Sequence, residues 1–201
     1  MRPAEKPLNE DARLVALHEF QILDTPAEKA FDDLARLACY VCDAPIALVS
    51  FVDRDRQWMK AKMGLAISET SRDVAFCAHA ILNPDDLLIV PDALLDERFV
   101  DNPLVTGEPK IRFYAGAPLV VEGGLAVGTL CVIDHSPKEL SPGQTKALKI
   151  LRNQVTRELE LHKKTAELSE MVKKLEQTRA DLAKSESRCR ELLEKAQTFS
   201  S

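Results

Sequence analysis

The chain has 201 residues with a formal net charge of −5, and 45% of them are apolar, so it is long enough for one domain with a sizeable core and a further segment. No apolar run reaches the roughly 20 residues that a membrane-spanning helix needs, and the first ten residues lack the apolar core of a signal peptide. No dense basic patch indicates nucleic-acid binding, so we expect a cytoplasmic protein with neither a nucleic-acid nor a membrane partner.

Two helices are expected before the first strand. Asn9 is a suitable N-cap for a short helix that runs to Phe20. A second helix is expected to begin at Thr25, with Pro26 at its first position and Glu28 completing a capping box. Its apolar residues recur at steps of three and four and form one buried stripe, made of Ala27, Ala30, Phe31, Leu34, Ala38 and Val41.

Two strands are expected next. Residues 46–52 are apolar at odd and even positions, which is typical of a central strand buried on both faces. After a polar turn over 53–56, residues 57–63 are expected to return as a second strand. Lys60 and Lys62 favour a sheet-edge position for it, because charge at an edge discourages pairing with another chain.

The middle of the chain is less regular. We expect a helix over 72–82, a short strand over 87–90 and a loop over 92–109, which is long enough to be functional or a lid. A hairpin over 112–134 follows, with its turn at Glu122-Gly123-Gly124. Its second strand is apolar at odd and even positions, so we expect both faces of the sheet to be covered and a small-molecule pocket on one of them.

A long helix is expected at the end of the chain. Ser141, Pro142 and Gln144 form a helix start, and neither proline nor glycine occurs after Gly143. A seven-residue repeat predicts a parallel coiled-coil dimer, with a single amphipathic helix as the alternative. The expected d positions are Leu161, Leu168, Leu175, Leu182, Cys189 and Ala196, and the a positions are Thr165, Val172, Arg179, Glu186 and Leu193.

Several blocks of the sequence carry a family resemblance. They read Arg112-Phe113-Tyr114-Ala115-Gly116-Ala117-Pro118-Leu119, Gly128-Thr129-Leu130-Cys131-Val132-Ile133-Asp134, Leu23-Asp24-Thr25-Pro26, Ile46-Ala47-Leu48-Val49-Ser50, Arg56-Gln57-Trp58, Phe76-Cys77-Ala78-His79-Ala80-Ile81 and Asp101-Asn102-Pro103-Leu104-Val105. Together they resemble GAF domains of bacterial signalling proteins of the sensor-kinase or diguanylate-cyclase type. The resemblance implies an α+β fold: a six-stranded antiparallel sheet with helices on one face and a ligand pocket on the other, followed by a long C-terminal helix. We expect a lead-in over 1–24, a GAF domain over 25–160 and a coiled-coil signalling helix over 161–201.

The resemblance also implies candidate ligand-binding residues. These are Trp58, Arg72, Cys77, His79, Arg112, Phe113, Tyr114, Thr129 and Cys131. Either arginine is suited to hold an anion or to form a salt bridge instead. Phe113 and Tyr114 point to opposite faces, so only one of them can line a given pocket. Cys77 is either a pocket residue or a core residue, and Ala78 separates it from His79, which disfavours the Cys-His pattern of bilin attachment.

The five cysteines do not indicate a disulfide framework, because their number is odd and the context is cytoplasmic. Cys39 and Cys42 form a C-x-x-C at the end of a helix, where the dipole opposes a thiolate, so we interpret them as core residues. No second C-x-x-C offers zinc its other ligands. We therefore expect no metal and no cofactor.

The resemblance implies a regulatory sensor module without enzymatic activity. It would bind an unknown small molecule or act as a dimerisation unit, and would signal as a parallel homodimer to a kinase, cyclase or phosphodiesterase output domain. Residues 185–196 resemble the lead-in to PAS domains, which favours an output in cis; otherwise the signal acts in trans. Two alternatives stay open: a GAF-fold free methionine sulfoxide reductase that uses Cys77 and Cys131, and a structural dimerisation domain whose pocket is filled by its own side chains.

Overall fold

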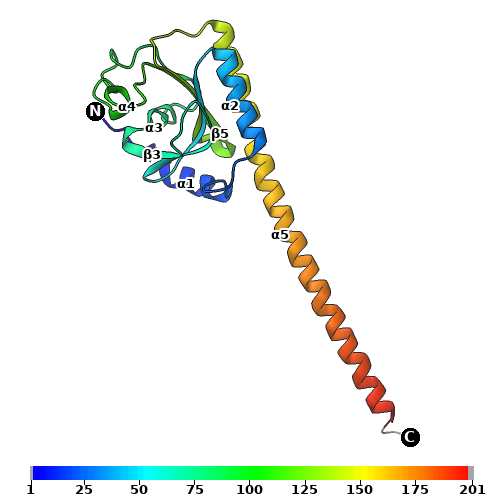
Figure 1. Ribbon diagram of the computed structural model, residues 1–201. Coiled ribbons are helices and arrows are strands. Elements are labelled where there is room, and N and C mark those ends of the chain that lie inside the picture. The colour runs from blue at the N-terminus through cyan, green and yellow to red at the C-terminus, as the bar shows by residue number, and fades with distance from the viewer. Residues whose placement is uncertain (1, 199–201) are drawn as a thin grey trace. The chain divides into compact units, whose positions relative to one another are not determined.

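The structure is a computed structural model that describes the backbone of residues 2–198 and the side chains through residue 189. It divides into two units, the first ending at Leu161 and the second beginning at His162. The first unit contains one six-stranded antiparallel sheet in the order β3-β2-β1-β6-β5-β4 (Figure 1). The strands are β1 (Ile46–Val52), β2 (Arg56–Met63), β3 (Glu69–Ser71), β4 (Leu88–Val90), β5 (Phe113–Val121) and β6 (Leu125–Asp134).

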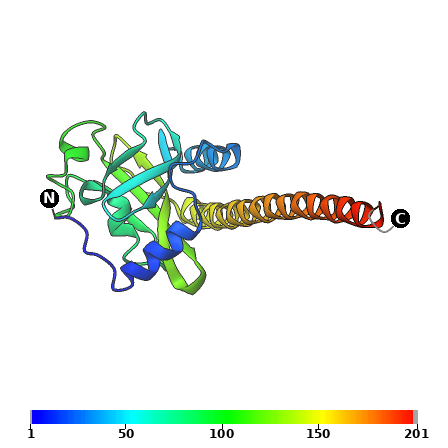
Figure 2. The ribbon, with the colours of Figure 1, turned by 90° about the horizontal axis from the view of Figure 1, so that it is seen from below.

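Five α-helices and two short 3-10 helices complete the described chain. They are α1 (Glu10–Glu19), α2 (Lys29–Cys42), η1 (Arg72–Val74), α3 (Phe76–Ala80), α4 (Pro103–Thr106), η2 (Glu122–Gly124) and α5 (Pro142–Thr198). Figure 2 shows the sheet with α2 on one side of it and the loops around α3 and α4 on the other. The expected α+β fold with a six-stranded antiparallel sheet is confirmed.

One hydrophobic core lies between the sheet and the helices α2 and α5. Phe31 and Ala35 of α2 and Leu148 and Val155 of α5 are all fully buried there, against strand residues such as Val49. The second core lies on the other sheet face. It is built from the alternate strand residues together with α3 and the loop before β5. Every residue of β1 is buried, so the expectations of a central strand and of two covered faces are confirmed.

The predicted glycine turn between the two hairpin strands and the predicted capping box of the long helix are both confirmed. The turn between β5 and β6 has positive φ at Gly123 (79°) and Gly124 (74°), which suits residues without a side chain. At the start of α5 the Gln144 backbone N–H donates to Ser141 Oγ (3.2 Å), and Gln144 Oε1 accepts from the Ser141 backbone N–H (2.9 Å). These two bonds complete the capping box.

The expected start of the second helix is wrong. The helix α2 begins at Lys29, and Glu28, not Thr25, occupies its N-cap position with extended backbone angles. The reason is a tertiary contact. The Lys60 amine donates to Thr25 Oγ1 (2.6 Å), the Pro26 carbonyl (2.7 Å) and Glu28 Oε1 (2.6 Å), so the groups expected to cap the helix bind a cation instead.

The expected edge position of residues 57–63 is also wrong, because β3 pairs outside β2. The register of β2 against β1 skips Lys60, since Ser50 faces Met59 and Val49 faces Ala61. Lys60 is therefore the extra residue of a β-bulge, which re-aims its side chain. That side chain is fully buried rather than at a solvent-facing edge.

The helix expected over 72–82 is interrupted. Ala75 has extended backbone angles (φ −78°, ψ 120°) and separates η1 from α3. The carbonyl before it, that of Val74, accepts a hydrogen bond from Asn102 Nδ2 (3.0 Å) in the long loop. A partner distant in sequence thus satisfies a backbone group that a continuous helix would have used internally.

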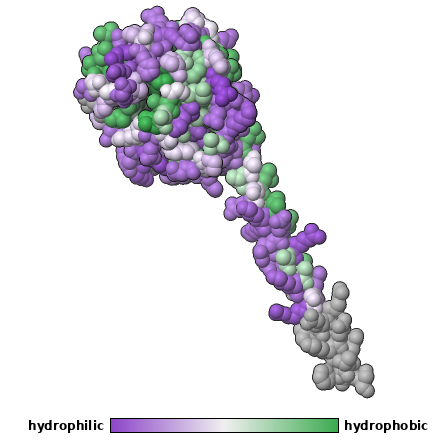
Figure 3. Space-filling model, viewed as in Figure 1, coloured by the Kyte–Doolittle hydropathy of each residue, from purple (hydrophilic) through white to green (hydrophobic). Residues whose placement is uncertain are grey.

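The described part of the second unit is helical. Its surface is mainly hydrophilic, with apolar side chains interrupting it along its length (Figure 3). The exposed apolar residues there are Leu168, Met171, Val172, Leu175 and Leu182, each 53–69% accessible. The side chains of Leu193 and Ala196, which the seven-residue repeat includes, and residues 199–201 lie outside the described part. Pairing with a second chain therefore stays a prediction.

Candidate functional site

A small cavity lies on the sheet face opposite α2 and α5. It has about 30 Å³ of free space, which is enough for about one or two water molecules. Its wall is mostly apolar and comes from five strands, from α3 and from the segments before β3 and before β5. The lining residues are Ile46, Leu48, Gln57, Met59, Leu65, Ile67, Thr70, Phe76, Cys77, Leu104, Pro109, Ile111, Tyr114, Cys131 and Ile133.

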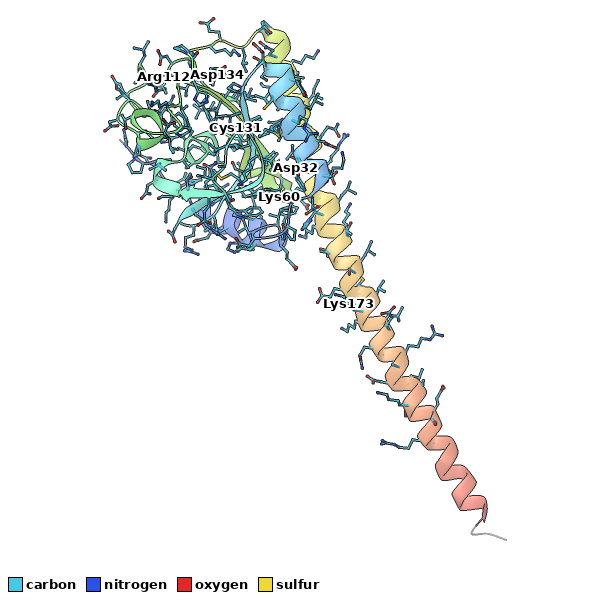
Figure 4. The ribbon with its side chains drawn as sticks, in the orientation of Figure 1. Asp32, Lys60, Arg112, Cys131, Asp134 and Lys173 are labelled. Atoms are coloured by element: carbon cyan, nitrogen blue, oxygen red, sulfur yellow. The ribbon has the colours of Figure 1, made fainter. Side chains whose placement is uncertain are left out.

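The thiol of Cys77 is the best-connected polar group of this cavity. Its Sγ accepts hydrogen bonds from Thr129 Oγ1 (3.0 Å), Tyr114 OH (3.3 Å) and Ser50 Oγ (3.4 Å). The Cys131 Sγ is 3.9 Å away. Each of these five side chains is at most 2% accessible. Side chains from β1, β5 and β6 thus meet at the sulfur atom that α3 supplies. Figure 4 labels the neighbouring Cys131.

These contacts separate the acidities of the two thiols. Burial by itself raises the pKa of Cys77, but the hydrogen bonds from Cys131, Ser50, Thr129 and Tyr114 outweigh it and lower the pKa to about 6. The hydrogen bond to Cys77 and burial hold the pKa of Cys131 well above its usual range. Burial also raises the pKa of the Tyr114 hydroxyl. The arrangement favours Cys77 over Cys131 as the thiolate.

A glycine makes room for one of these donors. A Cβ at Gly116 would lie 2.1 Å from the Tyr114 hydroxyl oxygen, far inside contact distance. The two residues are on the same strand, so Gly116 leaves the space that the phenol occupies above the sheet. The position of the Tyr114 hydroxyl beside Cys77 therefore depends on the absence of a side chain at residue 116.

Two further polar side chains line the cavity. Gln57 and Thr70 are directly opposite each other on β2 and β3. Gln57 is only 4% accessible, and Thr70 Oγ1 is buried without a hydrogen-bond partner among the described residues. A buried unpaired hydroxyl is costly. A ligand that supplied a hydrogen bond there would recover that cost.

The structure brings some of the sequence-predicted site residues together. Cys77, Tyr114 and Cys131 line the cavity, and Thr129 contacts the Cys77 sulfur. His79 is on the same short helix, with its ring packed edge-on against Phe99 at 4.9 Å between centroids. It does not line the cavity, and burial lowers its pKa.

The other predicted site residues lie elsewhere. Trp58 and Phe113 belong to the core on the opposite sheet face, beneath α2 and α5. Arg72 donates to Glu10 and to the carbonyls of Asp53 and Arg54. It is thus a structural link between α1 and the β1–β2 turn.

Arg112 has a similar role in the loop before β5. Its Nη1 donates to the carbonyls of Val105 (2.9 Å) and Ile111 (3.0 Å). Arg112 is labelled in Figure 4. These bonds hold the loop residues Leu104 and Ile111 where they line the cavity. Arg112 therefore supports the cavity wall without lining the cavity itself.

Sequence reasoning missed Gln57 and Thr70 as cavity residues and Ser50 as a hydrogen-bond partner of Cys77. Ser50 had a weak signal. It is the one polar residue of the strand over 46–52, as Thr129 is within 125–133, and their two hydroxyl oxygens lie 3.3 Å apart. Gln57 and Thr70 gave no such signal. Gln57 is one of several polar residues in β2, and the three-residue strand β3 has no apolar pattern of its own.

Cys39 and Cys42 show no comparable chemistry. Burial raises the pKa of Cys42 to about 11 and also raises that of Cys39. Among the side chains that the structure describes, those of residues 2–189, no group of three or more His, Cys, Asp or Glu is placed to hold a metal ion. No helix of the described backbone is long and apolar enough to cross a membrane.

Comparison with known proteins identifies the family. The GAF domain family matches residues 26–159. A cyclic di-GMP phosphodiesterase of Pseudomonas aeruginosa is 46% identical over 132 residues, which are 66% of this chain and 22% of that protein. This chain therefore spans less than a quarter of the length of that curated relative.

Solved structures of low sequence identity share the fold. The GAF domain of an Acinetobacter phosphoenolpyruvate-protein phosphotransferase has a TM-score of 0.56 at 16% identity, covering 76% of this chain and 93% of that one. A free methionine-R-sulfoxide reductase of Neisseria meningitidis has a TM-score of 0.55 at 14% identity, covering 83% and 99%. The chromophore-binding domain of an R. palustris bacteriophytochrome has a TM-score of 0.57 at 13% identity, covering 80% and 64%. With the family match over 26–159, the sheet topology and the covered pocket face, these findings show that the chain belongs to the GAF domain family.

Proposed function

We propose that this GAF domain is a regulatory sensor module that binds a small molecule in the cavity beside Cys77 and does no chemistry on it. The observation that carries the proposal is the partly polar wall of a cavity otherwise lined by apolar side chains. Thr70 Oγ1 lacks a partner among the described residues, and Gln57 is buried next to it. A ligand with one polar group and an apolar body would satisfy both features.

The loop before β5 is the element that such a ligand would move. The free space of about 30 Å³ is too small for a metabolite, so binding requires Leu104, Pro109 and Ile111 to move outward. A ligand shifts a conformational equilibrium only by its differential affinity for the two states. Here the two states would be the closed loop of this structure and an opened one.

We further propose that the chain is a parallel homodimer divided as 1–24, 25–160 and 161–201, with the last segment as the signalling helix. The exposed apolar side chains at seven-residue intervals, Leu168, Leu175 and Leu182, support it. The output would be a kinase, cyclase or phosphodiesterase domain, in cis or in trans. Similarity to a cyclic di-GMP phosphodiesterase favours cyclic-dinucleotide turnover. A cytoplasmic location is part of the same proposal.

Native mass spectrometry tests the ligand. The purified chain is weighed under native and denaturing conditions, and a bound small molecule appears as extra mass only in the native spectrum. Thr70→Val removes the unpaired hydroxyl at nearly constant volume and should reduce the retained fraction. Thr156→Val makes the same change on α5, away from the cavity, and should not. An empty wild-type cavity in cell extract and in metabolite mixtures would contradict the sensor proposal.

Light scattering tests the dimer. Leu168→Asn together with Leu175→Asn should convert it to a monomer, because both side chains occupy d positions. Glu170→Asn together with Gln177→Asn places the same new residues on the outer f positions of the same two heptads. That control should remain dimeric. Equal masses for both double variants would contradict the coiled coil.

A second candidate function is reduction of free methionine sulfoxide. The 3.9 Å distance between the Cys77 and Cys131 sulfurs favours it, because this reaction needs a nucleophilic and a resolving thiol. The test is turnover of free methionine-R-sulfoxide with a thiol reductant. Activity that disappears in Cys77→Ser would support an enzyme, and absence of turnover would leave the regulatory function.

A further inference from the structure

Two thiols from distant parts of the chain meet at the cavity. Cys77 is on α3 and Cys131 is on β6, and both are free thiols that line the cavity. Their sulfur atoms are 3.9 Å apart. A disulfide has an S–S distance of about 2.05 Å, so an approach of about 1.9 Å would join them.

The surroundings of Cys77 favour a nucleophile over a structural thiol. A packed cysteine needs little hydrogen bonding, because the thiol is only a weak donor and acceptor. Yet three hydroxyls, those of Ser50, Tyr114 and Thr129, donate to this one sulfur at 3.0–3.4 Å. Donors aimed at sulfur stabilise the thiolate, which is the reactive form.

The size of the cavity selects the reaction partner. Its free space of about 30 Å³ adjoins both sulfurs and holds a molecule of two heavy atoms, but not a metabolite, without movement of the loop. Hydrogen peroxide has this size, and each of its oxygens can donate and accept hydrogen bonds. The unpaired Thr70 hydroxyl and Gln57 give the same cavity a polar wall.

We propose that Cys77 is a site of oxidation by hydrogen peroxide and that Cys131 resolves the product to a Cys77–Cys131 disulfide. In the first step the Cys77 thiolate attacks one peroxide oxygen. The S–O bond forms, the O–O bond breaks, and the departing hydroxide takes up a proton to become water. In the second step Cys131 attacks the Cys77 sulfenic acid. The S–S bond forms, the S–O bond breaks, and the thiol proton leaves with hydroxide as a second water.

The disulfide would act on the sheet face that carries α3 and the long loop. Cys77 follows Phe76, whose ring stacks on Phe99 at 3.9 Å between centroids. Phe99 belongs to the long loop. A displacement of α3 toward β6 would therefore also displace the loop through this ring contact. The oxidation itself does not rest on the proposed ligand binding, and the two fail independently: an empty cavity in native mass spectrometry leaves the thiol chemistry untouched.

The test is peroxide treatment of the full reduced chain, followed by alkylation and peptide mapping by mass spectrometry. We expect a Cys77–Cys131 linked peptide pair that a thiol reductant reverses. Cys131→Ser should stop at a Cys77 sulfenic acid that dimedone traps. Cys42→Ser, which alters a buried cysteine of the other core, should leave the linked pair unchanged. Oxidation confined to Cys39, Cys42 or exposed Cys189, with Cys77 still reduced, would overturn the proposal.

Tyr114→Phe gives a readout that does not depend on removing a thiol. It deletes one donor to Cys77 and keeps the ring packing, so the oxidation rate of Cys77 should fall about tenfold, as expected for a lost hydrogen bond to a charged group. Tyr40→Phe is the matched control, since Tyr40 is an exposed residue of α2. An unchanged rate in Tyr114→Phe, with an unchanged melting temperature, would also overturn the proposal.

Discussion

Lys60 is a buried cation that joins the start of α2 to the sheet (Figure 4). Its amine donates to Thr25, Pro26 and Glu28, and it lies 5.6 Å from the centroid of the Phe31 ring. All the polar contacts of one side chain therefore fall in the segment that leads into α2. We interpret Lys60 as the residue that fixes where this helix begins.

The stability of Lys60→Met tests that interpretation. The variant removes the ammonium from which Thr25 Oγ1, the Pro26 carbonyl and Glu28 Oε1 accept hydrogen bonds, and we expect a loss of about 2–4 kcal/mol in the free energy of unfolding. Lys62→Met is the control, because Lys62 makes exposed hydrogen bonds to Ala66 and Ser68 and should cost less than about 1 kcal/mol. Urea unfolding of both variants gives the comparison, and equal losses would contradict a special role for Lys60.

Glu10 is an anionic residue that joins α1 to the rest of the domain. Its carboxylate accepts hydrogen bonds from Arg13, which is buried, and from Arg72. Burial raises the pKa of this carboxyl, but the hydrogen bonds from both arginines outweigh burial and lower the pKa to about 2 from 4.5. Arg72, one of the predicted ligand-binding residues, thus already holds an anion from within the chain.

A pH-dependent stability follows from this shift. A carboxyl whose pKa is lower in the folded state stabilises the protein fully above its unfolded pKa, and the contribution is lost as pH falls from about 4.5 toward about 2. Glu10→Gln should therefore melt below wild type at pH 7, with a loss of about 1–3 kcal/mol. The difference should shrink at pH 3. Glu5→Gln, in an exposed ion pair with Arg2, should show almost no difference at either pH.

At the scale of elements, long apolar runs were predictable and boundaries set by distant partners were not. The patterns of residues 46–52 and 112–134 fixed three strands, because an apolar strand can satisfy its pattern only in a covered sheet. The start of α2 and the break at Ala75 depend on Lys60 and Asn102, which lie 32 and 28 residues from the groups they bind. No local pattern contains that information.

The candidate site divides in the same way. Cys77, Tyr114 and Cys131 line one cavity. Strand alternation sets the faces of Tyr114 and Cys131, whereas Cys77 reaches the cavity from the short helix α3. Trp58 belongs to the opposite core. Two residues further along β2, the bulge at Lys60 reverses which of the following side chains face each side of the sheet. A bulge adds one residue without a fixed sequence signature, so side assignment across β2 was not predictable.

The proposed coiled coil of the second unit has a charged residue at a core position. In a parallel dimer, Arg179 would occupy an a position and face its own copy, which costs stability. Arg179→Leu should tighten the dimer by on the order of tenfold, equal to about 1.4 kcal/mol. Lys174→Leu adds the same side chain at an outer c position and should leave the dissociation constant unchanged. Sedimentation equilibrium distinguishes them, and equal effects would contradict the assigned register.

At the scale of the whole molecule, the two faces of the sheet are covered by different kinds of element. Its α2 and α5 side is a well-packed core, and Gln144 of α5 donates to the Val41 carbonyl of α2 (3.2 Å). Its other side is covered by the short helices α3 and α4 and by the long loop, which is anchored by Phe99 on Phe76 and by Asn102 on the Val74 carbonyl. These segments can shift without displacing the long helices α2 and α5, and local openings of this kind cost less than opening the whole domain. We therefore expect signals to enter on the loop side.

A chain ending at Leu161 should fold as a stable unit. Every buried residue of both cores lies at or before Leu159, so truncation removes no core side chain. The free energy of unfolding, measured at a concentration where wild type is monomeric, should change by less than about 1 kcal/mol. Wild type should in addition melt at higher temperature as concentration rises, because pairing of the second unit stabilises the folded state by mass action. The truncated chain should lose that concentration dependence, whereas an unfolded or aggregated fragment would show that residues beyond Leu161 are needed for the domain itself.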